Sequence, residues 1–239
     1  MCPKQDQGAS MKALPDLPLY DQVTWIFKES NFDYIELDYP MLNINQFKAE
    51  AELADDYYVD HRDESTGEGS HQGWQACTLY GIDTDKTNHW WVYDYELPPA
   101  HDWTELGDLC QYIKNFWLQF PAEFIYRSRF MKLDAGGMID THNDNPGDID
   151  LSIWHTLQIP INTAINHPAG CEMHVENTVV PFDDGKQFLV NIFKDHNVHN
   201  PTDTDRIHNI THVIPGSMHT LFANLVVRSY KKQYDKVSG

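Results

Sequence analysis

Two histidines, an aspartate and an arginine stand at a spacing that suits a mononuclear metal site. His142 and Asp144 are separated by one residue, His196 lies on a later segment, and Arg206 comes ten positions after that histidine. Two imidazoles and one carboxylate form the ligand set that holds non-haem Fe(II) while leaving coordination positions open. The fork of an arginine suits a carboxylate, such as the tail of a 2-oxo acid. These residues therefore predict a metal, a co-substrate class and an oxidation.

Spacing alone leaves alternatives open at this site. Residues i and i+2 of an extended segment face the same side, so His142 and Asp144 reach one ion if the segment is strand-like. His199 is a rival for His196 as the distal ligand, although on a regular strand the two face opposite sides. His208 follows the arginine by two residues and either supports the site or packs in a strand. With thirteen histidines in the chain, a His-x-Asp pattern by itself is expected by chance.

The predicted ligands lie within a longer ordered pattern. Its elements are Arg129 to Asp144 with the Gly136-Gly137 turn, Trp154-His155 to Pro160, Gly170-Cys171-Glu172, Phe182 to Lys186, His196 to Asn200, and Asp205-Arg206-Ile207-His208. In order and spacing, residues 125–214 resemble the aspartyl/asparaginyl β-hydroxylase family of Fe(II)- and 2-oxoglutarate-dependent oxygenases. The pattern is also similar to the related bacterial proline hydroxylases.

The resemblance implies roles for five residues. Fe(II) would be held by His142, Asp144 and His196, with 2-oxoglutarate and O₂ as co-substrates. Arg206 would bind the distal carboxylate of 2-oxoglutarate, and His155 would be a second contact to this co-substrate. No catalytic residue beyond the metal ligands is predicted.

The implied function is hydroxylation of a C–H bond in an aspartyl or asparaginyl residue, a free amino acid or a related small molecule. The expected partner is therefore a small-molecule or peptide substrate. Two other functions use the same ligands and remain open. One is a cupin-like binding or sensor protein that holds a metal without turnover, and the other is a zinc hydrolase.

From residue 124 onward the sequence is typical of a β-sheet protein. Strand-like runs cover residues 124–133, 154–162, 171–176, 186–193 and 206–214, and turn residues separate them. Such regular spacing predicts a jelly roll or barrel. The family resemblance implies the same architecture, a double-stranded, cupin-like β-helix over residues 124–214 in a mainly β protein with flanking helices.

Residues 1–120 predict a mixed α/β region that flanks the core and supplies pocket walls. Helices are expected over 20–29, over 45–55 with Asn45 as N-cap, over 102–119 with Asp102 or Thr104 as cap, and over 217–234 with Ser217 as cap. Strands are expected over 74–82 and 89–96, bordering a polar loop at 61–73. No linker divides the chain, so we expect one domain over residues 1–239.

Composition excludes several partner classes. A net charge of −19 would repel the phosphates of nucleic acids and of anionic membranes. No apolar run approaches the roughly 20 residues of a membrane helix, and the first residues lack the apolar stretch of a secretory signal. The four cysteines show no paired spacing, which favours reduced thiols and a cytoplasmic protein.

Several other side chains have two possible roles. Arg129 is either a site residue or a salt-bridge partner on a strand face. Trp74, Trp90 and Trp91 either line a substrate pocket or pack in the sheet. Alternation places Glu172, His174 and Glu176 on one exposed acidic face. Surface or packed positions are expected for His167, His212 and His219.

Overall fold

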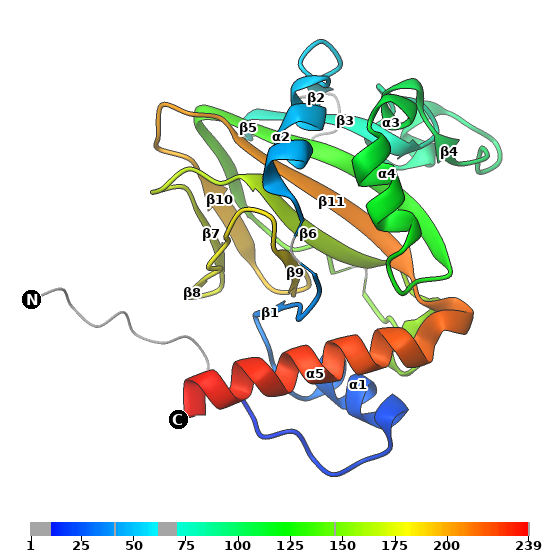
Figure 1. Ribbon diagram of the computed structural model, residues 1–239, viewed down its shortest axis with the longest axis vertical. Coiled ribbons are helices and arrows are strands. Elements are labelled where there is room, and N and C mark those ends of the chain that lie inside the picture. Colours follow the sequence, from blue (N-terminus) through cyan, green and yellow to red (C-terminus); the bar gives the residue numbers. More distant parts are fainter. Residues whose placement is uncertain (1–10, 41, 62–70, 146, 239) are drawn as a thin grey trace, which may run out of the picture.

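Antiparallel strands dominate the second half of the chain, and helices flank them (Figure 1). The computed structural model describes residues 11–40, 42–61, 71–145 and 147–238. The strands are β1 (Tyr34–Glu36), β2 (Val59–Asp60), β3 (Gln72–Gly81), β4 (Asp102–Trp103), β5 (Phe124–His142), β6 (Ile159–Asn166), β7 (Glu172–Val175), β8 (Thr178–Val179), β9 (Gln187–Val190), β10 (His196–His199) and β11 (Arg206–Ile214). The α-helices are α1 (Leu19–Lys28), α2 (Ile44–Glu52), α3 (Glu105–Leu109), α4 (Gln111–Leu118) and α5 (His219–Ser238), with 3₁₀ helices η2 (Trp90–Tyr93), η3 (Leu151–Thr156) and η4 (Gly216–Met218).

The strands form two layers that share β5. Their order is β1-β9-β6-β11-β5-β10-β7-β8, and β3 adds to the sheet beside β5. The larger layer runs from β1 to β5, and the smaller layer contains the end of β5 with β10, β7 and β8. All of these strand pairs are antiparallel. This arrangement confirms the predicted mainly β, jelly-roll fold with flanking helices.

The long strand β5 changes partners at a glycine bend. Its first half pairs with β11 up to Leu133, and its last residues pair with β10 from Met138 onward. Gly136 has a φ of +74°, which only glycine adopts easily. A Cβ on Gly137 would lie 2.8 Å from the carbonyl oxygens of Asp134 and Gln72. The bend therefore requires both glycines, and it carries the end of β5 into the smaller layer.

Two hydrophobic cores lie on opposite faces of the larger layer. The outer core joins the sheet to the helices and includes Trp117, Phe130 and Phe222. The inner core lies between the two layers and contains Leu133, Ile139, Cys171, Met173, Val175, Val180, Phe188, Val190 and Val198. The inner core therefore marks the interior of the barrel, toward which site residues must point.

The C-terminal helix closes one edge of the larger layer. Helix α5 lies against α1 and β1 (Figure 1). The Gln233 side-chain amide accepts a hydrogen bond from the Glu36 backbone N–H and donates one to the Tyr34 carbonyl, both at 3.0 Å. The outer edge of β1 is thus paired with a side chain. Among the helices of the described ranges, none is long and apolar enough to cross a membrane.

The predicted single helix over 102–119 is wrong, because the chain breaks at Cys110. Residues 102–103 form β4, and the segments on either side of Cys110 form α3 and α4. Thr104 caps α3 as predicted, since its hydroxyl accepts from the Gly107 N–H. The Glu50 carboxylate of α2 accepts from the backbone N–H groups of Tyr112 and Ile113 at 2.6 and 2.9 Å. This carboxylate satisfies the start of α4, so a second helix can begin there.

Two predicted strands and two predicted helix caps also differ from the structure. The predicted strand 89–96 contains the 3₁₀ helix η2, in which the His89 and Trp91 rings stack at 4.2 Å. The strand expected from residue 154 begins at Ile159, because Trp154 turns inward within η3 onto Phe222. The cap positions also move, since α2 is preceded by Asn43 rather than Asn45 and α5 begins after η4 rather than at Ser217.

The remaining element predictions agree with the structure or lie outside it. Helices α1 and α5, and strands β3, β7, β9 and β11, match the predicted segments to within a few residues. Strand β5 begins as predicted at Phe124 but runs to His142, well beyond the predicted end at residue 133. Most of the polar loop predicted over 61–73 lies outside the described residues, and Gln72 and Gly73 belong to β3.

Candidate metal centre

Three of the predicted side chains converge at the start of β10. His142, Asp144 and His196 each offer a ligand atom, and these atoms all lie within 4.8 Å of one another. His196 is the direct cross-strand partner of His142, so the two histidines come from adjacent strands rather than from opposite sides of the barrel. Asp144 lies beyond the end of β5, where its backbone N–H donates to the Ile192 carbonyl at 2.9 Å.

Backbone carbonyls set the tautomer of both histidines. The Nδ1 of His142 lies 2.7 Å from the Asp140 carbonyl, and the Nδ1 of His196 lies 3.0 Å from the Lys194 carbonyl. A carbonyl oxygen only accepts, so Nδ1 carries the proton in each neutral ring and Nε2 keeps its lone pair. This second hydrogen bond is the usual way in which a protein orients a metal-binding imidazole.

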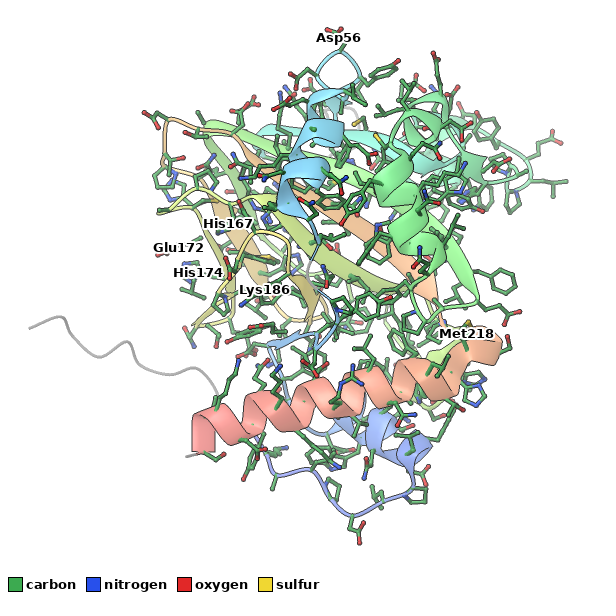
Figure 2. The ribbon with its side chains drawn as sticks, in the orientation of Figure 1. Asp56, His167, Glu172, His174, Lys186 and Met218 are labelled. Atoms are coloured by element: carbon green, nitrogen blue, oxygen red, sulfur yellow. The ribbon has the colours of Figure 1, made fainter. Side chains whose placement is uncertain are left out.

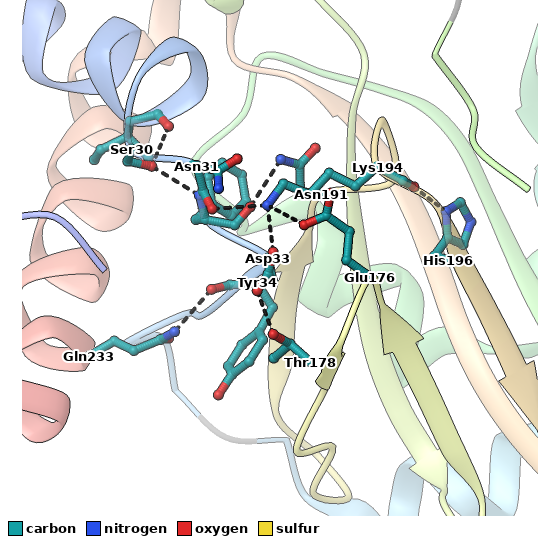
Figure 3. A network of polar contacts seen from close by, with 12 residues as sticks. Ser30, Asn31, Asp33, Tyr34, Glu176, Thr178, Asn191, Lys194, His196 and Gln233 are labelled. Carbon is teal, nitrogen blue, oxygen red and sulfur yellow. Dashed lines mark hydrogen bonds and ion pairs between the residues drawn. The ribbon is translucent and has the colours of Figure 1, made fainter. Parts of the chain in front are cut away.

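A buried ion pair supports the carbonyl behind His196 (Figure 3). Lys194 Nζ lies 2.6 Å from Asp33, and the two side chains are only 11% and 7% exposed. Asp33 also accepts from the Thr178 hydroxyl at 2.6 Å, and Lys194 donates to the Asn31 carbonyl at 3.0 Å. Lys194 is therefore held on several sides, and its own carbonyl fixes the His196 ring.

The donor set fits a hard or borderline divalent ion with open coordination positions. It offers two imidazole nitrogens and one carboxylate, the combination typical of non-haem Fe(II). None of the three cysteines in the described ranges belongs to the cluster. His199 is exposed and alternates with the buried His196 and Val198, so it faces away from the barrel interior. The structure brings His196, and not its rival, to the other two ligands.

An aromatic wall borders the candidate metal centre. The Trp74 ring on β3 lies 6.3 Å from the His142 ring, between centroids, and the His71 ring lies 5.5 Å from it. Trp74 also contacts His61, with 4.6 Å between ring centroids. The sequence analysis gave Trp74 two possible roles, lining a substrate pocket or packing in the sheet. Nothing in the sequence pointed to His71 or His61. Trp91, by contrast, is 57% exposed.

Arg206 lies at the bottom of the inner core and faces no carboxylate of the described chain. It is 3% exposed, its guanidinium carbon lies 5.9 Å from the centre of the Phe182 ring, and its Nε has no hydrogen-bond partner among the described residues. Burial lowers the pKa of Arg206 to about 10, so the group stays cationic at neutral pH. A buried cation with an unsatisfied donor is the environment that an anionic ligand requires.

The histidines beside Arg206 are His208 and His167. His208 Nδ1 lies 3.0 Å from Arg206 Nη2, and His167 contacts His208 in turn. His155 lies elsewhere, on η3, where its Nδ1 is 2.6 Å from the Tyr20 hydroxyl and its ring is 5.8 Å from that of His219. The role of His155 as a co-substrate contact therefore stays a prediction. Sequence reasoning missed His167, because no pattern in the chain marks it.

The expected acidic face on β7 is only partly correct. Glu172 and His174 do share a face, with 2.9 Å between Oε2 and Nε2, and both project from the smaller layer (Figure 2). Glu176 lies beyond the strand end with a φ of +51° and instead reaches Lys194 at 3.4 Å. The left-handed turn at Glu176 therefore breaks the alternation that the sequence suggested.

A two-layer β-helix with a His/Asp/His cluster at its mouth and a buried arginine inside defines the class of non-haem metal-dependent oxygenases. The model of the family described as "Aspartyl/Asparaginyl beta-hydroxylase" matches residues 37–215. The chain belongs to this family. It is accordingly a 2-oxoglutarate-dependent Fe(II) oxygenase, with Fe(II), 2-oxoglutarate and O₂ as its cofactor and co-substrates. The match begins at residue 37, well before the ordered sequence pattern of residues 125–214.

Solved structures give distant similarities. A prolyl hydroxylase from Trichoplax adhaerens, in complex with a fragment of a hypoxia inducible factor, is 10% identical, with a TM-score of 0.49 and coverage of 85% of this chain and 92% of that chain. A prolyl-4-hydroxylase from Pseudomonas putida is 14% identical, with a TM-score of 0.42 and coverage of 82% and 98%. A 2OG-Fe(II) oxygenase family oxidoreductase from Burkholderia pseudomallei is 9% identical, with a TM-score of 0.45 and coverage of 87% and 96%. These values are too low to support a functional argument. No curated protein sequence matches the chain.

Proposed function

We propose that the protein hydroxylates a C–H bond of an amino-acid substrate, with Fe(II) held by His142, Asp144 and His196. The observation that carries the proposal is the convergence of these three ligand atoms within 4.8 Å. When bound, iron and 2-oxoglutarate supply the chemistry that transfers one atom of O₂ to the substrate, with succinate and CO₂ as co-products. The chain itself orients the two imidazoles through the carbonyls of Asp140 and Lys194.

We assign the distal carboxylate of 2-oxoglutarate to Arg206. The assignment is supported by the buried guanidinium with its unsatisfied Nε, because a carboxylate would supply both the counter-charge and the missing acceptor. Arg206 also adjoins Cys171 of the inner core, since its charge acts on the pKa of that thiol. The pocket for the co-substrate therefore belongs to the same barrel interior that His196 and Val198 face.

The substrate would be an aspartyl or asparaginyl residue, a free amino acid or a related small molecule. Support comes from Arg127 and Arg129, two arginines that are each 6% exposed. On the regular part of β5 they share the face of Leu133, which points into the inner core. Arg129 lies 3.4 Å from His61, whose ring meets that of Trp74 edge to face beside the metal centre. Arg129 is therefore close enough to the aromatic wall of the metal centre to contact a bound substrate.

Turnover of 2-oxoglutarate tests the proposal directly. Succinate formation should require Fe(II) and O₂ and should be lost in His142→Ala and His196→Ala, whereas His199→Ala should keep it. Arg206→Leu should raise the KM for 2-oxoglutarate at least tenfold, which corresponds to a lost charged hydrogen bond. Metal binding without succinate formation under any of these conditions would instead indicate a non-catalytic binding protein.

The substrate part of the proposal has its own test. Free amino acids and peptides that contain Asp or Asn should be screened for a mass gain of one oxygen atom. Arg129→Met should then raise the KM for the substrate and leave the KM for 2-oxoglutarate unchanged. An equal effect on both would argue that Arg129 only supports the fold.

A further inference from the structure

Two neutral imidazoles and a carbonyl form a continuous hydrogen-bonded chain behind Arg206. Arg206 Nη2 lies 3.0 Å from His208 Nδ1, His208 Nε2 lies 3.0 Å from His167 Nδ1, and His167 Nε2 lies 2.9 Å from the Cys171 carbonyl. His208 is fully buried on β11, and His167 follows β6. Figure 2 labels His167 near the smaller layer, where it contacts the Cys171 carbonyl just before β7. The chain therefore spans three segments of the barrel.

The carbonyl at the far end determines where every proton lies. The Cys171 oxygen only accepts, so His167 carries its proton on Nε2. A neutral His167 then offers the lone pair of Nδ1, and His208 must donate to it from Nε2. This leaves the Nδ1 lone pair of His208 to accept from the Arg206 guanidinium. With both rings neutral and donating toward the Cys171 carbonyl, the chain presents an acceptor to Arg206.

We propose that His167 and His208 are positioning residues for the co-substrate, because their fixed tautomers hold the Arg206 guanidinium in the orientation that binds the carboxylate of 2-oxoglutarate. The inference rests on the proposed role of Arg206. One acceptor on one side of the guanidinium satisfies that edge and leaves Nε and the remaining N–H groups for the ligand. Pre-orientation of this kind lowers the cost of binding, because a buried side chain need not be ordered again.

Asn162 gives the chain an alternative arrangement. Its Oδ1 lies 2.7 Å from the same His208 Nδ1 that faces Arg206. If His167 gained a proton, it would donate from both nitrogens, and His208 would accept at Nε2 and move its own proton to Nδ1. That proton would go to Asn162, and Arg206 would lose its acceptor. The neutral arrangement requires the side-chain NH₂ group of Asn162, rather than its Oδ1, to face His208 Nδ1. A rotation of the amide provides this, because its two ends have the same shape.

The surroundings keep the neutral arrangement in place at ordinary pH. Burial and the nearby Arg206 lower the pKa of His167 to about 4 and hold the pKa of His208 well below its usual value. The charged groups that face His167 are Arg206 and Asp184, which accepts from the His167 backbone N–H at 2.9 Å and pairs with Lys48. The Phe182 ring covers both imidazoles, at 5.2 Å from His167 and 4.6 Å from His208.

The first experiment determines which ring nitrogen carries the proton in His167 and His208 of the wild-type protein. Long-range ¹H–¹⁵N spectra of the histidine-labelled protein, without metal or co-substrate, should show the proton of both rings on Nε2 at pH 7. As the pH approaches about 4, the His208 proton should move to Nδ1. A proton on His208 Nδ1 at pH 7 would overturn the inference.

The second experiment compares variants by the KM for 2-oxoglutarate. His167→Leu should raise it about tenfold with little change in kcat, because the charged hydrogen bond at Arg206 weakens. His167→Asn, which keeps an acceptor for His208, should restore most of the affinity. His174→Leu on the outer face is the matched control and should leave the KM unchanged. A wild-type KM in His167→Leu, or a loss confined to kcat, would refute the positioning role.

Arg206→Leu separates this inference from the proposed function. If that variant raises the KM for 2-oxoglutarate and His167→Leu does not, only the positioning chain is wrong. If Arg206→Leu leaves the KM unchanged, the assignment of the co-substrate carboxylate to Arg206 fails, and the chain of imidazoles has no role in binding it.

Discussion

Replacing Asp33 with asparagine measures how far the metal centre depends on the ion pair behind it. The substitution keeps the shape of the side chain and leaves the Lys194 ammonium without its closest counter-charge, in a place where the two side chains are 11% and 7% exposed. Breaking a buried pair costs roughly 3–5 kcal/mol. Lys194 keeps the Asn31 carbonyl and the more exposed Glu176, so we expect a loss of about 2 kcal/mol in the free energy of unfolding.

The same substitution should weaken metal binding. The Lys194 carbonyl holds Nδ1 of His196, and loss of a group that supports a metal ligand costs about tenfold or more in affinity. Urea unfolding of the metal-free protein measures the stability, and a titration with Mn²⁺ followed by electron paramagnetic resonance measures the affinity. Asp38→Asn is the matched control, because Asp38 pairs with Lys232 and Arg228 at the surface.

Exposed pairs contribute at most about 1 kcal/mol, so Asp38→Asn should change stability little and metal affinity not at all. If Asp33→Asn destabilises the protein no more than Asp38→Asn does, the buried pair is not a support of the site. If it destabilises the protein while Mn²⁺ binds with wild-type affinity, the pair stabilises the fold alone.

Three further predictions concern metal, pH and thiols. Mn²⁺ at about 100 times its Kd should raise the free energy of unfolding by about 2.7 kcal/mol in the wild type and in His199→Ala; a similar gain in His196→Ala would contradict the ligand assignment. Burial lowers the pKa of His167 to about 4 and holds those of His208 and His212 well below the usual value, so the unfolded chain takes up protons near pH 6.5 while the native protein does not. Stability should therefore fall as the pH drops from about 6.5 toward about 4, and urea unfolding that is constant over this window would show that the native rings also protonate. Burial raises the pKa of Cys77, and it raises that of Cys110 to about 12, so iodoacetamide should leave both thiols of the folded protein unmodified at pH 8, as checked by mass spectrometry.

The candidate ligands could be named from their place in the family's ordered pattern, whereas spacing alone left His199 as a rival of His196. His142 and Asp144 are two residues apart, and His196 opens a strand in which alternation separates it from His199. Alternation shows that His196 and His199 face opposite sides, and the structure shows that His196 is the one that faces inward. The jelly-roll fold was predictable because its short strands are separated by regular turn residues.

What could not be predicted depends on contacts between distant segments. His167 follows β6, and it reaches His208, and through it Arg206, only because β6 and β11 pair along their length. The break at Cys110 occurs because Glu50, on another helix, supplies a carboxylate to the start of α4. The aromatic segment 89–96 is a different case, because contacts between neighbouring rings, His89 on Trp91 and Trp90 against Trp91, accompany its 3₁₀ turn. At His167 and at Cys110, a tertiary contact decides what the local sequence leaves open.

The amide of Gln233 on the outer edge of β1 has a consequence for self-association. An open strand edge is a template on which another chain can add a strand, and natural proteins cover or interrupt such edges. Here a single side chain of α5 occupies the Glu36 N–H and the Tyr34 carbonyl. Trimming α5 ahead of Gln233 would leave these groups open, and copies of the protein could then join edge to edge into oligomers. The C-terminal helix thus keeps the sheet from growing between molecules.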